Sequence, residues 1–333
     1  MKENLVSVII PAYNHENYVQ ETINSIINQT YQNIELIIVD DGSSDSTWQK
    51  ICALEDKCKE RFCNISFETQ ENEGTCATLN KLLSKAQGEF VYFIASDDIA
   101  KPEAIEIELD FLKNNPNYGL VVGNSEIIDY DGKICYWDKK RNIEYNKNKA
   151  KYKTFVDHAK VKNKYFDNEK FGTYSTLYMG NYIPNGYLIR KNVLDKIPKF
   201  TTKAPLEDWF MMLQLSKYTK FKYIDKILFS YRWHGKNAIL NKEKIQKFAA
   251  LTRNFESQII QQLDLSSSRE DVAQTVENGA LYKKKGIPYI FEILKYKKYH
   301  TEKEITKKEI KLFNVKIFSK TKEFWCNFHI FRV

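Results

Sequence analysis

Short runs of apolar residues, each about the length of one strand, recur through the first third of the chain. They occupy residues 5–10, 34–39, 65–67, 90–94 and 120–122. Short, predominantly apolar runs are typical of strands that are buried on both faces. Pro11 closes the first run, because proline has no N–H to donate to a neighbouring strand.

Between these runs, apolar residues recur at intervals of three and four, which is the spacing of one helical face. The intervals predict helices near residues 19–27, 48–54, 79–86 and 105–112, and Pro102 suits the first turn of the last one. Strands that alternate with helices indicate an α/β fold whose mostly parallel sheet is covered on both faces.

The pattern changes after about residue 125. Asp131-Gly132, which lies between two apolar pairs, predicts a hairpin turn. Strands are next predicted at Tyr187–Arg190 and Ile227–Trp233, with a helix at Asp208–Lys217 between them. The polar stretch 138–172 has no clear period and is either a mobile substrate loop or a plain insertion.

Composition narrows the class of protein. Of the 333 residues, 43% are hydrophobic and 14% aromatic, which excludes a disordered chain. The 21 tyrosines either serve the core or stack on flat ligands such as sugars or bases. No apolar run reaches the ~18–20 residues of a membrane-spanning helix, and no signal peptide is evident, so we expect a cytoplasmic protein. The six cysteines form no C-x-x-C pair, and we expect reduced thiols.

Positive charge is concentrated towards the C-terminus. The net charge is +8, and residues 281–333 hold 14 Lys and Arg against 5 Asp and Glu. Apolar residues at helical spacing from Lys242 onward predict amphipathic helices outside the core domain. Such a basic tail, interleaved with aromatic residues, fits an anionic membrane surface, a nucleic acid or a solvated helical face.

Two acidic pairs follow predicted strands: Asp40-Asp41 and Asp97-Asp98. In open parallel sheets, ligands bind at the carboxyl ends of the strands. Carboxylates gathered there repel one another unless a cation or good donors intervene, and Mg²⁺ or Mn²⁺ is a suitable cation. The alternative is that the acids cap the helices that follow, which suits Asp45 and Asp40 better than Asp98.

Three ordered motifs resemble those of family 2 glycosyltransferases. They are Ser7-Val8-Ile9-Ile10-Pro11-Ala12-Tyr13-Asn14, then Val39-Asp40-Asp41-Gly42-Ser43-Ser44-Asp45, and then Ala95-Ser96-Asp97-Asp98. The resemblance spans roughly residues 5–235. It implies the GT-A fold, a Rossmann-like and mostly parallel sheet flanked by helices, and a transfer reaction that inverts the anomeric centre of the sugar.

The resemblance, together with the change of pattern, predicts where the domains begin and end. The predicted parts are a transferase domain at 1–240, with a nucleotide-binding half at 1–125 and an acceptor half at 126–240, and a helical basic extension at 241–333.

The resemblance also implies roles for single residues. The residues that would contact the nucleotide are Pro11, Ala12, Tyr13, Asp41, Asn72 and Asp97. Among them, Asp41 would accept a hydrogen bond from the base ring N–H and Asp97 would face the ribose. Asp98 would hold Mn²⁺ or Mg²⁺ on the diphosphate.

Two positions depart from the family pattern. Ala95 stands where the family commonly has the first Asp of an Asp-x-Asp-Asp cluster, so one possible carboxylate near the nucleotide is missing. Leu79 stands where relatives often carry Arg. We therefore expect neutralisation of the diphosphate to depend more on the metal and on other groups.

Glu207-Asp208-Trp209 resembles the acceptor motif of the family, with Glu207 and Trp209 at the acceptor and Asp208 as the base that takes the proton of the attacking hydroxyl. Inversion requires one such base and a stabilised leaving group. The alternative for Glu207 or Asp208 is an acid favoured by the start of a helix. His234, in Tyr231-Arg232-Trp233-His234, resembles a closing motif of the site and is a candidate metal ligand.

The resemblance implies a UDP-sugar donor (UDP-glucose, UDP-galactose or their N-acetyl forms) and a glycan acceptor in bacterial surface or lipid-linked glycan assembly. We expect residues 281–333 to hold the protein peripherally at the inner, anionic face of a membrane, and we expect no nucleic acid partner. No G-x-G-x-x-G follows the first strand, which argues against a dinucleotide-binding dehydrogenase. The remaining alternative is a non-catalytic scaffold of the same fold that binds carbohydrate or membrane.

Overall fold

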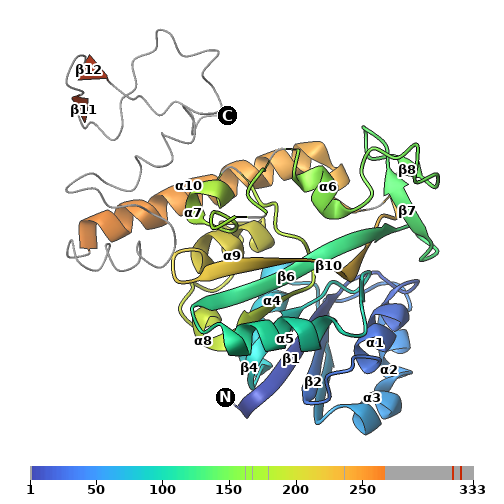
Figure 1. Ribbon diagram of the computed structural model, residues 1–333. Coiled ribbons are helices and arrows are strands. Elements are labelled where there is room, and N and C mark those ends of the chain that lie inside the picture. Colours follow the sequence, from blue (N-terminus) through green and yellow to red (C-terminus); the bar gives the residue numbers. More distant parts are fainter. Residues whose placement is uncertain are drawn as a thin grey trace.

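A computed structural model describes residues 2–266, except 162, 167, 179 and 236, together with 317–318 and 323–324. Its centre is a large sheet (Figure 1). In spatial order the main strands are β3 (Asn64–Thr69), β2 (Ile34–Asp40), β1 (Lys2–Ala12), β4 (Gly88–Phe93), β9 (Tyr187–Arg190), β6 (Tyr118–Ile128), β10 (Lys220–Arg232) and β5 (Ile99–Ala100). The predicted strands at the start of the chain are therefore confirmed.

Strands β3, β2, β1 and β4 are parallel, as the alternating pattern predicts. Beyond them the sheet is mixed, because β9 is antiparallel to both β4 and β6, while β6 and β10 are again parallel. The α/β fold is confirmed, and the parallel part of the sheet is the half that carries the first two acidic motifs. Its carboxyl ends lie at one edge, where a ligand is expected to bind.

Helices cover both faces of the sheet, because side chains of a strand point alternately to its two sides. In β1, Val8 and Ile10 belong to one buried cluster and Ile9 to the other. The first cluster packs against α1 (Val19–Ile27), α2 (Thr47–Cys52), α3 (Glu55–Arg61) and α5 (Ala104–Asn114). The second packs against α4 (Thr75–Lys85), α6 (Phe155–Ala159), α7 (Tyr174–Leu177), α8 (Lys191–Leu194) and α9 (Glu207–Leu215).

The predicted hairpin turn at Asp131-Gly132 is confirmed. β7 (Ile134–Trp137) pairs antiparallel with the end of β6, and Gly132 has a φ of +79°, which glycine adopts without strain. The polar stretch 138–172 contains the short strand β8 (Ile143–Glu144) and α6, and it buries Phe166 and Phe171 in the second cluster. The later part of this stretch, from Tyr152, therefore contributes to the core, whereas residues 139–149 are mostly exposed.

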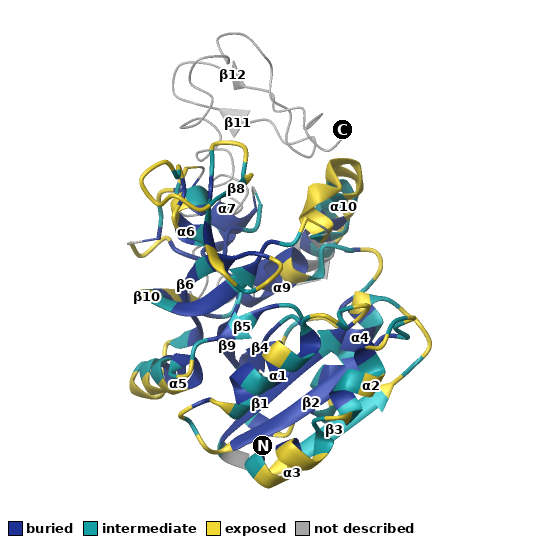
Figure 2. Cartoon of the chain, turned by 90° about the vertical axis from the view of Figure 1, so that its right-hand side faces the viewer, coloured by how far each residue is buried: buried dark blue, intermediate teal, exposed yellow. Residues whose placement is uncertain are grey.

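The C-terminal helix α10 (Lys242–Ser266) lies against the core, which differs from the expectation that helices beyond residue 241 lie outside it. The 3₁₀ turn η1 (Ala238–Leu240) leads into it. Ile260 is buried in the second cluster, while the outer face of α10 is exposed (Figure 2). The carboxylate of Glu256, wholly buried, accepts a hydrogen bond from the Tyr174 hydroxyl (2.7 Å) and pairs with Lys217 Nζ (2.6 Å).

The basic tail at 281–333 lies outside the described residues, apart from the short pair β11 (Ile317–Phe318) and β12 (Glu323–Phe324). Within the part of the chain that is described, no helix has both the length and the apolar character needed to cross a bilayer.

Candidate active site

The sheet order brings the first two acidic motifs to one place, because β1 lies between β2 and β4. Ala12 at the end of β1 is paired with Asp40, and the Asp41 N–H donates to the Ala12 carbonyl at 2.8 Å. Ala12 is buried, whereas the side chain of Tyr13 is 47% exposed beyond the strand. The residues predicted to line the nucleoside, Pro11 included, are therefore neighbours at the carboxyl edge.

Asp41 is buried and its carboxylate holds the loop before α4. It accepts hydrogen bonds from Gln70 Nε2 (2.8 Å), the Glu73 N–H (3.0 Å) and the Gly74 N–H (3.0 Å). Asn72 lies in the same loop and is exposed. The structure thus brings Asn72 to the edge that carries Asp41.

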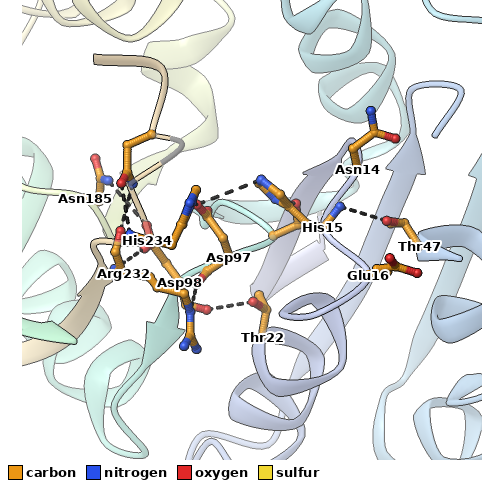
Figure 3. A network of polar contacts seen from close by, with 12 residues as sticks. Asn14, His15, Glu16, Thr22, Thr47, Asp97, Asp98, Asn185, Arg232 and His234 are labelled. Carbon is orange, nitrogen blue, oxygen red and sulfur yellow. Dashed lines mark hydrogen bonds and ion pairs between the residues drawn. The ribbon is translucent and has the colours of Figure 1, made fainter. Parts of the chain in front are cut away.

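Asp97 lies just beyond β4 and faces two histidines (Figure 3). Its Oδ2 is 3.0 Å from His234 Nε2 and 4.0 Å from His15 Nε2. Burial acts to raise the pKa of Asp97, but the hydrogen bond with His234 and the charge interaction with His15 outweigh it and lower the pKa. Asp97 is therefore an ionised acceptor that points at two imidazoles.

Asp98 points elsewhere and is almost completely buried. One carboxylate oxygen accepts from the Arg232 backbone N–H (2.8 Å), and the other lies 3.4 Å from Asn185 Nδ2. Burial, and then the neighbouring Asp97, raise the pKa of Asp98 well above its usual range. The two adjacent side chains thus diverge: of the predicted metal ligands, His234 contacts Asp97, while Asp98 points to Asn185.

Arg232 locks these elements together from the end of β10. Its buried guanidinium donates to the carbonyl oxygens of Asp97 (2.7 Å) and Asp129 (3.2 Å), and it forms an ion pair with Glu21 on α1. Its central carbon lies 4.8 Å from the centre of the Tyr18 ring. Sequence reasoning missed this role, although Arg232 stands two positions before His234 in a motif that was singled out.

Two residues near the site have purely structural surroundings. Trp209, predicted at the acceptor, is buried, and its indole N–H donates to the Leu177 carbonyl at 2.7 Å. It therefore supports α9 from inside the core. Leu79 is also buried, on the inner face of α4.

Glu207 and Asp208 form the first turn of α9. Asn181 Nδ2 donates to one oxygen of Asp208 at 2.9 Å, and the Trp209 N–H donates to the other at 2.6 Å. Desolvation by the surrounding chain raises the pKa of Asp208, although its side chain keeps access to solvent. Desolvation and the adjacent Asp208 raise the pKa of Glu207 to about 7.

A common region connects the acids beyond β4 with those of α9. The pKa of Tyr231 is raised first by burial and then by the charges of Asp98, Asp97 and Asp208. The charges of all three carboxylates thus act on this one phenol. The segment 181–185 makes the same connection, since Asn181 holds Asp208 and Asn185 contacts Asp98.

The donor set at Asp97 suits a divalent metal ion. A carboxylate oxygen and the Nε2 of His234 are side-chain ligands that transition metals accept, and both lie at the carboxyl edge of the sheet. A metal ion there can act as a Lewis acid on a diphosphate.

The sheet order is that of the GT-A fold, the architecture of transferases that use nucleotide-sugars. Two solved structures have a similar fold. Residues 1–349 of Staphylococcus aureus TarS, in complex with UDP-GlcNAc, match with a TM-score of 0.50 and 18% identity, over 82% of this chain and 79% of that one. The mannosyltransferase PcManGT from Pyrobaculum calidifontis, in complex with GDP-Man and Mn²⁺, matches with a TM-score of 0.51 and 15% identity, over 90% of this chain and 88% of that one. Residues 7–175 match the glycosyl transferase family 2 model, and the chain belongs to that family.

Curated relatives are similar to part of this chain. The Escherichia coli UDP-Glc:α-D-GlcNAc-diphosphoundecaprenol β-1,3-glucosyltransferase WfgD is 34% identical over 148 residues, which is 44% of this chain and 56% of that protein. Chondroitin synthase of E. coli is 26% identical over 246 residues, which is 73% of this chain and 31% of that protein. An uncharacterised glycosyltransferase of Haemophilus influenzae is 39% identical over 132 residues, which is 40% of this chain and 51% of that protein. The chain thus spans about half of the length of these relatives, or less.

Proposed function

We propose that this protein is an inverting glycosyltransferase that moves a hexose or N-acetylhexosamine from a UDP-sugar to a hydroxyl of a glycan or lipid-linked glycan. The observation that carries the proposal is that Asn185 contacts Asp98, next to the acid–histidine pair Asp97–His234, while Asn181, four residues earlier, holds the carboxylate of Asp208. We assign the Asp97–His234 side to a metal-bound leaving group and the Asp208 side to the base. The name of WfgD, which includes a UDP-sugar donor and a lipid diphosphate acceptor, supports the substrate class.

On the donor side, we propose that Asp97 and His234 hold Mn²⁺ or Mg²⁺, which as a Lewis acid stabilises the departing diphosphate. Asp98 then has a positioning role, because its carboxylate is occupied by the Arg232 N–H and Asn185. Tyr13, whose ring is exposed beyond β1, is placed to stack on the base. Pro11, Ala12, Asp41 and Asn72 complete the nucleotide-binding edge.

On the acceptor side, we assign Asp208 as the general base. The Asn181 amide fixes one of its oxygens, and a raised pKa makes the carboxylate a better proton acceptor than an ordinary aspartate. Glu207, beside it, is assigned to the acceptor hydroxyl groups. The basic segment 281–333 is assigned to an anionic membrane surface near the lipid-linked acceptor, with the protein on the cytoplasmic side.

The test separates donor binding from chemistry. Asp208→Asn keeps the size of the side chain and loses the base, so kcat should fall by about 10²- to 10⁴-fold while the donor KM changes little. Asp195→Asn, at an exposed surface acid, is the matched control and should keep full activity. Excess chelator should abolish turnover of the wild type.

Near wild-type turnover by Asp208→Asn would show that the base is another group, with Glu207 the next candidate. Full activity in chelator would refute the metal. Glycan binding without turnover of any nucleotide-sugar would instead identify a non-catalytic scaffold.

A further inference from the structure

His15 completes a three-residue cluster with Asp97 and His234 (Figure 3). One ligand atom of each residue (the two imidazole nitrogens and a carboxylate oxygen) lies within 4.8 Å of the other two. Metal–ligand bonds of about 2.1 Å place neighbouring ligands about 3 Å apart and opposite ones about 4.2 Å apart. The spacings of 3.0 Å (His234 to Asp97) and 4.0 Å (His15 to Asp97) lie within this range.

The ring of His15 is oriented before any ion binds. Its Nδ1 lies 2.8 Å from Ser96 Oγ, so the other ring nitrogen is the one directed at Asp97. Ligand histidines usually donate from the second nitrogen to such a partner, which fixes the tautomer that offers a lone pair to the metal. The ring of Tyr18 contacts both imidazoles: its centre lies 6.0 Å from that of His15, and it stacks on His234 at 5.2 Å.

The backbone around His15 is held from several sides. Its N–H donates to Thr47 Oγ1 (2.8 Å), and its carbonyl accepts the N–H groups of Tyr18 and Val19 at the start of α1. The preceding Asn14 has a φ of +51°, an uncommon conformation for a residue other than glycine. Such a conformation persists only where its surroundings enforce it, and it is frequent in ligand sites.

We infer that His15 is a third protein ligand of the metal, so that two imidazoles and one carboxylate bind it. Imidazole nitrogen suits transition metals, whereas Mg²⁺ prefers oxygen ligands and retains its water. The cluster therefore selects Mn²⁺ or a later divalent transition metal over Mg²⁺. The inference rests on the metal site of the proposed function and adds both a ligand and a selectivity to it.

The test measures metal binding without nucleotide and without turnover. Purified full-length protein is titrated with MnCl₂, free Mn²⁺ is read by electron paramagnetic resonance, and Mg²⁺ is measured by competition. His15→Ala should raise the Kd for Mn²⁺ about tenfold or more and narrow the preference for Mn²⁺ over Mg²⁺. Ser96→Ala should also raise the Kd for Mn²⁺ and narrow the preference for Mn²⁺ over Mg²⁺, but by smaller factors than His15→Ala. The matched control is His158→Ala, a histidine on α6 that packs against Trp137.

An unchanged Kd for Mn²⁺ in His15→Ala, while Asp97→Asn abolishes binding, would overturn this inference and leave the proposed metal site intact. Weaker UDP binding by His15→Ala in chelator, with normal Mn²⁺ binding, would show that His15 contacts the diphosphate directly and would also overturn it. If Asp97→Asn binds Mn²⁺ as the wild type does, the metal site of the proposed function fails as well.

Discussion

The buried ion pair between Glu256 and Lys217 offers a direct measurement of how firmly α10 is joined to the core. Both side chains are almost wholly inaccessible to solvent. Besides the 2.6 Å contact with Lys217, the carboxylate accepts hydrogen bonds from the Tyr174 hydroxyl and the Gln214 amide. We choose Glu256→Gln, because it removes the charge and keeps the volume.

The expected cost follows from what Glu256→Gln leaves behind. Lys217 stays charged and buried, and its acceptors are then neutral: the Gln214 carbonyl oxygen at 2.9 Å and the introduced amide oxygen. Removing one partner of a buried pair typically costs about 3–5 kcal/mol in the free energy of unfolding. Adding Lys217→Met removes the unpaired charge, so the double variant should be more stable than Glu256→Gln alone.

The assay is equilibrium unfolding in urea, followed by circular dichroism and by tryptophan fluorescence. Lys191→Met is the control, since its partner Asp195 is exposed and such pairs contribute about 0–1 kcal/mol. A loss below about 1 kcal/mol for Glu256→Gln, or additive losses in the double variant, would refute the reasoning that a charge pair fastens α10.

Two further predictions follow from charges elsewhere. The pKa of Glu207 is raised from 4.5 to about 7 in the folded protein, so this carboxyl stabilises the fold fully below pH 4.5 and the contribution is lost as the pH rises through 7. Glu207→Gln should therefore make the free energy of unfolding depend less on pH between 4.5 and 7. The same pH dependence in the variant and the wild type would contradict this prediction. Truncation after residue 280 should weaken binding to anionic liposomes and leave the affinity for UDP unchanged, whereas equal liposome binding by both forms would exclude a membrane role for the tail.

The local pattern predicted the parallel half of the fold well. The apolar runs that became β1, β2 and β4 are long, and a strand buried on both faces needs little else to be recognised. The Asp131-Gly132 turn carries its own chemical signal. The direction of β9 was not predictable, because a strand of four residues does not encode which neighbours it pairs with.

The motifs placed the candidate acids at the ends of strands, but they carried no information on the direction in which single side chains point. Consecutive residues in a turn point in different directions, so the sequence could not distinguish Asp97, which faces His234, from Asp98, which faces Asn185. His15 had no signal of its own, since its proximity to Asp97 depends on β1 and β4 being adjacent. For the same reason, Lys217 and Glu256 became partners only once α10 had packed on α9.

The short segment 181–185 acts as a spacer of fixed length. It ends at Gly186, whose φ of +73° and close approach to the Phe229 ring leave no room for a side chain. Since one amide of the segment holds Asp208 and another contacts Asp98, insertions in 138–172 or extensions of the C-terminus can lengthen the chain without changing the separation of these two carboxylates. On the proposed function, the chain after residue 126 can thus differ in length and surface while the separation of Asp208 and Asp98 stays the same.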